Sequence, residues 1–372
     1  MDQERLALLA LHFVPGIGDF LAKQLISYCG SATAAFKTTK GKLMKIPGIG
    51  EASAAALKNH QPYKKAEEEL KRAEKENVKI LFYLDQQFPQ RLKQFDDCPS
   101  MLYLKGHVDI NTKKTVAIVG TRQATMYGKE VVETLVDGLI PYQPLIISGL
   151  AYGIDIHAHK QALKNDMPTL GVMASGIDII YPAAHRETAH KMLANGGLIT
   201  ENPFGTKPDA HNFPARNRII AALADALVVV EAAERGGALI TAELANSYNK
   251  DVFAVPGAIG QRYSEGCNKL IKINKAHLVT GVKDIVYIMN WDIDKPQSST
   301  PAGQLDLALY DADEQCVLEL LKEKNGPMAI DELSRKSSLS PGILASLLLN
   351  LEFKDAVRSL PGKLYKLNRG NR

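Results

Sequence analysis

Apolar residues recur at helical spacing through the first part of the chain, and two similar turns interrupt them. The turns are VPGIG at residues 14–18 and IPGIG at residues 46–50, and an amphipathic run follows each one. Proline and glycine side by side end a helix and allow a tight reversal of the chain. The pattern therefore predicts a helical module at residues 1–78 in which a short helical hairpin occurs twice.

Between residues 79 and 291 the pattern changes to short apolar runs rich in β-branched residues, each followed by a turn and a longer amphipathic stretch. The runs occupy residues 115–119, 145–147, 169–173, 198–200, 226–230 and 251–255. Buried parallel strands have such continuous apolar runs, and helices connect one strand to the next. We therefore expect an α/β domain of the extended Rossmann-like type, with a doubly wound parallel sheet.

The last part of the chain has a different organisation. Residues 292–308 are polar, rich in proline, serine and threonine, and without apolar periodicity, which predicts a linker. Residues 309–372 carry three amphipathic segments and then two short apolar runs, which predicts a winged-helix domain. The third segment, residues 341–351, contains no arginine or lysine. Because a DNA-reading helix uses such side chains, we expect this one to pack or to contact protein.

Composition and charge exclude only a few classes of protein. The formal net charge is +4, so any surface for a polyanion has to be local. The four cysteines form no CxxC pair, which argues against a zinc site or a disulfide framework. The N-terminus lacks the basic start of a signal peptide, and no apolar stretch reaches the roughly 18 residues of a membrane helix. We expect a cytoplasmic protein without a membrane partner.

The turn after the first run of the central domain brings together Gly120, Thr121 and Arg122. It lacks the GxGxxG spacing that seats a dinucleotide, so no nicotinamide or flavin cofactor is expected. A hydroxyl and a guanidinium suit a single phosphate of a strand, because the planar guanidinium donates two hydrogen bonds at once. Since ligands bind at the carboxyl ends of parallel strands, this turn is a candidate site.

Two later turns on the same predicted edge are rich in glycine. Ser148, Gly149 and Gly153 follow the second run, and Gly236 and Gly237 open a helix after the fifth. Glycines at such positions let backbone amides approach a phosphate closely, and a helix N-terminus favours an anion. The sequence therefore offers three phosphate-binding turns along one edge of the sheet.

The stretch FPARNR at residues 213–218 combines an aromatic residue with two arginines and an asparagine. It holds Phe213, Arg216, Asn217 and Arg218, and Lys207 precedes it. An aromatic ring beside cations is the arrangement that single-strand binding uses, because bases stack on the ring and cations follow the backbone. The alternative is a helix start whose phenylalanine enters the core and whose arginines pair with acidic residues.

The central domain contains further short motifs in a definite order. They are FPQRL (88–92), YLKG (103–106), VAIVGTR (116–122), SGLAYGID (148–155), GIDIIYP (176–182), FPARNRIIA (213–221), VVVEA (228–232), GGALITAELA (236–245), VFAVPG (252–257) and GCNKLI (266–271). Together they resemble the DNA-processing protein A (DprA, also called Smf) family. The helical module, which is similar to helix-hairpin-helix or SAM-like modules, and the winged helix extend the resemblance to nearly the full length.

The resemblance implies a protein that binds single-stranded DNA, forms a homodimer through the Rossmann-like domain and loads the RecA recombinase in natural transformation. Carried onto this chain, it assigns strand binding to Gly120, Thr121, Arg122, Phe213, Arg216, Asn217 and Arg218. One motif departs from the family. The usual Ser-Gly-Ser-Leu is Gly-Gly-Ala-Leu at residues 236–239, so two hydroxyls are absent and only the amides remain.

Two other classes of function compete with this interpretation. The lysine-decarboxylase-like nucleotide phosphoribohydrolases share a Rossmann-like core, and here Glu231 and Glu243 offer carboxylates for hydrolysis. The third hypothesis is a protein-interaction module, with the winged helix as the surface for the partner and an inert Rossmann-like domain. Neither a P-loop nor a Ser-His-Asp arrangement occurs, and His157 and His159 have no third metal ligand nearby, so no catalytic residue, metal or cofactor is expected.

Overall fold

The computed structural model describes residues 2–291, 310–324, 326–354, 356–360 and 364–367. Contacts divide the chain into two compact units, Met1–Asp292 and Ile293–Arg372. The expected linker at 292–308 lies outside the described residues. Among the described residues, no helix is long and apolar enough to cross a membrane.

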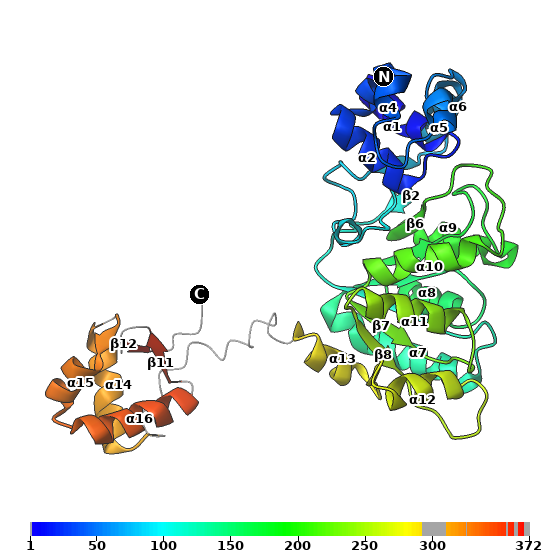
Figure 1. Ribbon diagram of the computed structural model, residues 1–372. Helices are drawn as coiled ribbons and strands as arrows, with labels where there is room; N and C mark the ends of the chain where they lie inside the picture. The colour runs from blue at the N-terminus through cyan, green and yellow to red at the C-terminus, as the bar shows by residue number, and fades with distance from the viewer. Residues whose placement is uncertain (1, 292–309, 325, 355, 361–363, 368–372) are drawn as a thin grey trace. The chain divides into compact units, whose positions relative to one another are not determined.

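The first unit begins with short helices that surround their own apolar core (Figure 1). They are α1 (Gln3–His12), α2 (Asp19–Cys29), α3 (Ala32–Lys37), α4 (Lys40–Leu43), α5 (Glu51–Ala56) and α6 (Gln61–Lys75). The two predicted turns pack against each other reciprocally. A Cβ on Gly16 would lie 3.0 Å from Ser53 Oγ, and one on Gly48 would lie 2.9 Å from Leu21 Cδ2. Both glycines have positive φ angles, so the repeat in sequence is also a repeat in structure.

A nine-stranded sheet follows, with the order β1-β2-β6-β5-β4-β3-β7-β8-β9. Its strands are β1 (Lys79–Phe82), β2 (Met101–His107), β3 (Thr115–Val119), β4 (Leu145–Ser148), β5 (Thr169–Val172), β6 (Gly196–Thr200), β7 (Ala226–Val229), β8 (Asp251–Ala254) and β9 (His277–Leu278). Strands β3 to β8 confirm the six predicted runs and pair in parallel with their neighbours among these strands. The sheet is mixed, however, because β1 and β2 add an unpredicted antiparallel edge beside β6.

Helices cover both faces of this sheet, as a doubly wound fold requires. On one face lie α7 (Met126–Leu139), α8 (Ile154–Lys164) and α13 (Val282–Ile288), and on the other lie α10 (Asn212–Leu223), α11 (Gly237–Ser247) and α12 (Glu265–Lys272). Helix α9 (Arg186–Met192) contacts β5 and β6. Strand β3 is buried on both faces: Val116 and Ile118 pack against α7, whereas Ala117 and Val119 belong to the core beneath α10.

The helical segment is joined to the antiparallel edge of the sheet. Leu9 of α1 and Ala66 of α6 share a core with Phe82 and Tyr103 of β1 and β2. At the first hairpin, the carboxylate of Asp19 accepts hydrogen bonds from the backbone and hydroxyl of Ser100 at 2.7 and 2.6 Å. The two parts of the first unit are therefore held together by apolar and polar contacts.

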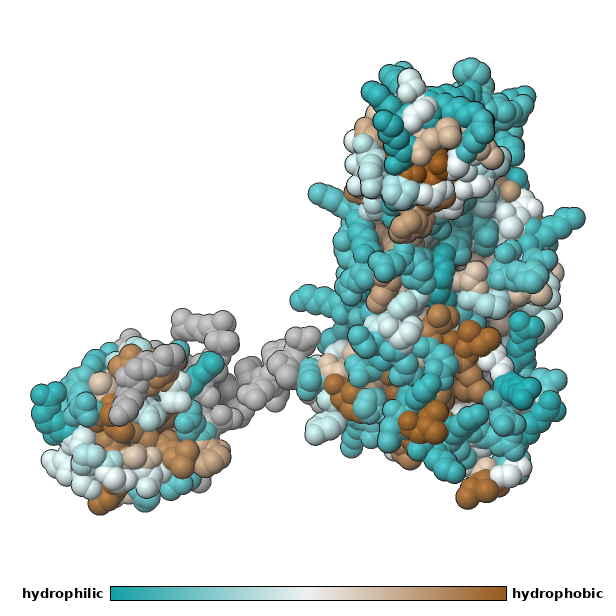
Figure 2. All heavy atoms as spheres, in the orientation of Figure 1, coloured by the Kyte–Doolittle hydropathy of each residue, from teal (hydrophilic) through white to brown (hydrophobic). Residues whose placement is uncertain are grey.

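The second unit is the predicted winged helix. It consists of α14 (Ala312–Lys324), β10 (Met328–Ala329), α15 (Ile330–Ser337), α16 (Pro341–Phe353), β11 (Val357–Leu360) and β12 (Leu364–Leu367). Leu344, Leu348 and Leu351 of α16 enter the core. The outward side of α16 exposes Leu349 and Phe353, and Figure 2 shows apolar atoms over the part of this unit where α16 lies.

Candidate nucleic-acid interface

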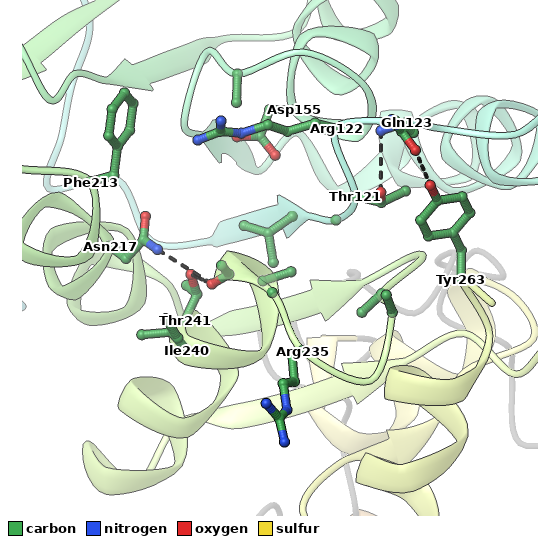
Figure 3. Close-up of a pocket in the computed structure, with 18 of the residues that line it drawn as sticks. Thr121, Arg122, Gln123, Asp155, Phe213, Asn217, Arg235, Ile240, Thr241 and Tyr263 are labelled. Atoms are coloured by element: carbon green, nitrogen blue, oxygen red, sulfur yellow. Dashed lines mark hydrogen bonds between the residues drawn. The ribbon is translucent and has the colours of Figure 1, made fainter. Parts of the chain in front are cut away.

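A pocket of about 420 Å³ opens at the carboxyl ends of β3 and β7 (Figure 3). The chain continues from β3 to β4 on one side, whereas β7 flanks β3 on the other, so this is the point where the order of the strands reverses. Open α/β sheets bind ligands in the crevice at that point. The pocket is formed by the turns after β3 and β7, the first turn of α10 and the loop after β8.

The turn after β3 projects one charged side chain into this pocket. The amide of Thr121 donates to the carbonyl of Glu231 at 2.7 Å, and the carbonyl of Thr121 accepts from Ile154 at 3.2 Å. Gly120 packs against Ile154, where a Cβ would come within 2.5 Å of a side-chain atom. These contacts fix the backbone on both sides and leave Arg122 exposed, so Arg122 is the charged group of this turn that can meet a ligand, beside the lining residues Thr121 and Gln123.

Arg122 reaches toward Phe213 at the start of α10 (Figure 3). Its guanidinium carbon lies 5.3 Å from the centroid of the Phe213 ring, and that of Arg216 lies 6.0 Å from the same centroid. The ring of Tyr181 stands 6.0 Å away at an angle of 58°. Phe213 is partly exposed, so a π-face and a free guanidinium are available side by side.

Arg216 is buried, unlike Arg122. Its Nη1 donates to the carbonyl oxygens of Gly149 and Val172. The carboxylate of Asp155 interacts with it electrostatically and accepts from backbone amides of the turn after β4. Burial lowers the pKa of Arg216 to about 10, which leaves the guanidinium charged at neutral pH. The structure thus places Arg216 in the buried floor of the pocket, where it links the turn after β4 to β5.

The turn after β4 contributes less open backbone than the sequence predicts. Ser148 is buried and donates to the carbonyl of Ile118 at 2.6 Å. A Cβ on Gly149 would lie 2.6 Å from atoms of both Arg216 and Asp155. Gly153 has a φ of +80°, and its Cβ would lie 2.1 Å from the carbonyl of Thr121. Close packing therefore explains these two glycines.

The remaining residues of the basic stretch lie elsewhere. Arg218 donates to the carbonyl of Asp97 and to the carboxylate of Glu201, and it does not line the pocket. Lys207 is exposed and does not line it either. Asn217 is buried and donates to the carbonyl of Gly237 at 3.3 Å, so it supports the start of α11. Among these three residues, only Asn217 is brought to the pocket.

The turn after β7 provides the open backbone that the other two lack. Gly236 precedes α11, and a Cβ built on it would meet nothing within 4 Å. A Cβ on Gly237 would meet only Asn217 Nδ2 at 3.8 Å. The first amides of a helix have no carbonyl partner within it. Because the protein's own packing does not demand glycine at these positions, the free space in front of the amides suits a ligand.

Sequence reasoning missed several residues that line the pocket. Gln123 accepts a hydrogen bond from the hydroxyl of Tyr263, and Arg235 and Arg262 are exposed at the rim. Arg122, Arg235 and Arg262 form no ion pair among the residues that the structure describes. The arginine–tyrosine pair at 262–263, with the guanidinium carbon 5.6 Å from the ring, was a signal of the same kind as FPARNR.

The carboxylates proposed for hydrolysis are engaged in structural contacts. Glu231 is buried and accepts from the backbone and hydroxyl of Thr125 at 2.9 and 2.6 Å, at the start of α7. Glu243 forms an ion pair with Lys275 at 2.6 Å. These contacts do not favour the phosphoribohydrolase alternative.

The two histidines also have structural contacts. His157 Nε2 lies 3.0 Å from Glu133, and His159 is buried against the hydroxyl of Thr169 at 2.7 Å. Within the described ranges, no cluster of three potential metal ligands occurs.

Comparisons with known proteins show the family of this chain. The family model "DNA recombination-mediator protein A" matches residues 79–290, and the model "DprA winged helix domain" matches residues 295–363. Protein Smf of Synechocystis sp. is 30% identical over 98% of this chain and 99% of its own length. DNA processing protein DprA of Bacillus subtilis is 38% identical over 60% of this chain and 76% of its own length.

Two solved structures are similar as well. DNA processing protein A from Streptococcus pneumoniae has 31% identity and a TM-score of 0.66, covering 76% of this chain and 97% of that one. DNA processing protein A from Helicobacter pylori, whose single-stranded DNA binding mode is the subject of that structure, has 29% identity and a TM-score of 0.53, covering 58% and 96%.

Proposed function

Because the chain belongs to the DNA-processing protein A (DprA/Smf) family, we propose that it binds single-stranded DNA in the pocket at the carboxyl ends of β3 and β7. The observation that carries the proposal is the pairing of a partly exposed ring, Phe213, with an exposed guanidinium, Arg122, 5.3 Å away. A base stacks on the ring while the cation binds the adjoining phosphate. The single-stranded DNA binding of the Helicobacter pylori relative supports this assignment.

The charges of the pocket favour a polyanion over a neutral ligand. Arg122, Arg235 and Arg262 stand at its rim, whereas the acid that lines it, Asp155, is buried beside Arg216. Free amides at Gly237 add partial positive charge at the start of α11. Stacking on a ring and binding of phosphates do not distinguish one base from another, so the strand is bound with little sequence preference.

We also propose that the chain acts in the cytoplasm as a homodimer that delivers the bound strand to the RecA recombinase in natural transformation, without catalysing a reaction itself. Exposed apolar side chains at the open edge of the sheet support a dimer through this domain. Ile273 after α12 and Leu278 in β9 are 47% and 49% exposed. Light scattering of wild-type and Leu278→Asp protein tests the dimer, and RecA filament formation on protein-coated strands tests the delivery.

Fluorescence anisotropy of a labelled oligonucleotide, single-stranded or duplex, tests DNA binding at several salt concentrations. Arg122→Ala should weaken single-strand binding and lower the salt slope by about 0.7, the value for one phosphate contact. Phe213→Leu should cost about 1–3 kcal/mol through lost stacking, with the slope retained. Arg335→Ala removes an exposed arginine of α15 and serves as the charge control. Unchanged binding in both pocket variants would exclude this site.

A further inference from the structure

We propose that the bound strand continues past Arg122 into a second groove, between the N-terminal halves of α7 and α8, where Lys129 and Lys160 bind its phosphates. This inference rests on the proposed function, since it extends the same binding path. The groove has a volume of about 560 Å³. Arg122 lines both the groove and the main pocket, so the two form one continuous surface.

The charges in the groove favour a polyanion. Lys129 in α7 is partly buried and Lys160 in α8 is exposed, and both line the groove. Neither ammonium has an ion-pair or hydrogen-bond partner in the part of the chain that the structure describes. The nearby carboxylate of Glu133 is 3.0 Å from His157 Nε2, so it is already engaged by another residue of the groove. The carboxylate of Glu187 also interacts electrostatically with Lys160, but it is exposed and forms its ion pair with Lys191. Three cations therefore line the groove without a salt bridge among the residues that the structure describes.

Tyr152 provides an aromatic surface between the two sites. Its side chain is 49% exposed, and it lines both this groove and the small hollow beneath Phe213. The ring is held edge-on against His185, with 4.8 Å between centroids. The groove therefore combines an exposed aromatic ring with three cations, those of Arg122, Lys129 and Lys160. Single-strand binding sites have this combination, because the cations follow the phosphates of the backbone while the bases stack on the ring.

The length of the oligonucleotide separates this inference from the proposed function. We would compare wild-type protein with Lys129→Ala/Lys160→Ala by anisotropy, using oligothymidylates of about 5 and about 15 nucleotides, near the two ends of known site sizes. The short strand fills the main pocket alone. The variant should bind the short strand like wild type, whereas its affinity for the long strand should fall and the salt slope should decrease by about 1.4, the value for two phosphates.

Lys164→Ala is the matched control, because Lys164 is an exposed lysine one turn further along α8 that does not line the groove. It should leave both strands unaffected. Equal weakening by Lys164→Ala and by the double variant would mean a general charge effect and overturn the inference. Equal affinities of wild type and double variant for the long strand would also overturn it, while short-strand binding that depends on Arg122 would still support the main pocket.

Discussion

The guanidinium of Arg122 lies over the ring of Phe213, with 5.3 Å between its carbon and the ring centroid. The two residues are far apart in the sequence and come from the turn after β3 and the first turn of α10. The backbone of the neighbouring Thr121 is hydrogen-bonded on both sides. A fixed turn and a cation–π contact thus hold the side chain in position before any ligand arrives.

The shape of the guanidinium should matter as much as its charge. In Arg122→Lys the ammonium keeps the positive charge but loses the planar fork that stacks on an aromatic ring and donates two hydrogen bonds. We expect weaker single-strand binding by about 1 kcal/mol, with the salt slope of the wild type retained. Anisotropy across a salt series measures both quantities. A double-mutant cycle with Phe213→Leu should give a coupling energy different from zero, and additivity would contradict the contact.

Two glycines at this edge should respond in opposite ways to the same substitution. Gly236→Ala should leave the melting temperature unchanged, because a Cβ there meets nothing within 4 Å and the backbone is extended, but it should weaken DNA binding by intruding on the ligand. Gly153→Ala should destabilise the fold by at least about 1–3 kcal/mol, because φ is +80° and the Cβ would strike the carbonyl of Thr121. Thermal melting and anisotropy together check the pair; a stable Gly153→Ala variant would refute the packing argument.

Arg216 should affect stability as well as DNA binding. Arg216→Met removes one partner of a buried charge pair and leaves Asp155 without compensation, which costs about 3–5 kcal/mol. Chemical denaturation should show this loss without DNA, and Asp155→Asn in the same chain should restore part of it. Arg122→Ala, at an exposed position, should melt like wild type. If Arg216→Met were fully stable and only its DNA binding were impaired, the role of Arg216 in linking the turn after β4 to β5 would be wrong.

Helix α10 illustrates which part of the site the sequence can predict. The motif FPARNR predicts an aromatic and cationic site, but successive helical positions point in different directions, about 100° apart. Phe213 and Arg216, three positions apart, both line the pocket, with Arg216 buried in its floor, whereas Arg218 points away and reaches Glu201. Which arginine is free depends on acids and carbonyls from distant segments, which a linear pattern cannot reveal.

The fold can be predicted from the sequence better than the site can, because the patterns that indicate its strands and helices are local. Apolar runs between turns identify the six parallel strands, since burial on both faces requires continuous apolar residues. The sequence did not predict strands β1 and β2, because their pairing is antiparallel and falls outside the βα repeat. Arg262 and Tyr263 likewise reach the pocket from the loop after β8, and no local pattern indicates that this loop folds back toward β3.

Acid should destabilise the first unit through a buried histidine. Burial, with added repulsion from His185 and Arg216, lowers the pKa of His159 to about 3, and its Nε2 has no hydrogen-bond partner. In the unfolded chain its pKa returns to about 6.5, so between these values the unfolded state binds more protons and stability falls as pH falls. The contribution amounts to about 2 kcal/mol at pH 5. His159→Leu should therefore lose less melting temperature than wild type between pH 7 and pH 5.

His190→Leu is the control for this effect, because His190 is exposed in α9 and should keep the wild-type pH dependence. His12 contributes in the same direction, since burial also lowers its pKa, so the dependence should shrink in His159→Leu without vanishing. Identical melting curves for His159→Leu and wild type at both pH values would mean that His159 takes up a proton in the folded state. The network around Arg216 would then have to tolerate a further positive charge, contrary to the burial and contacts described above.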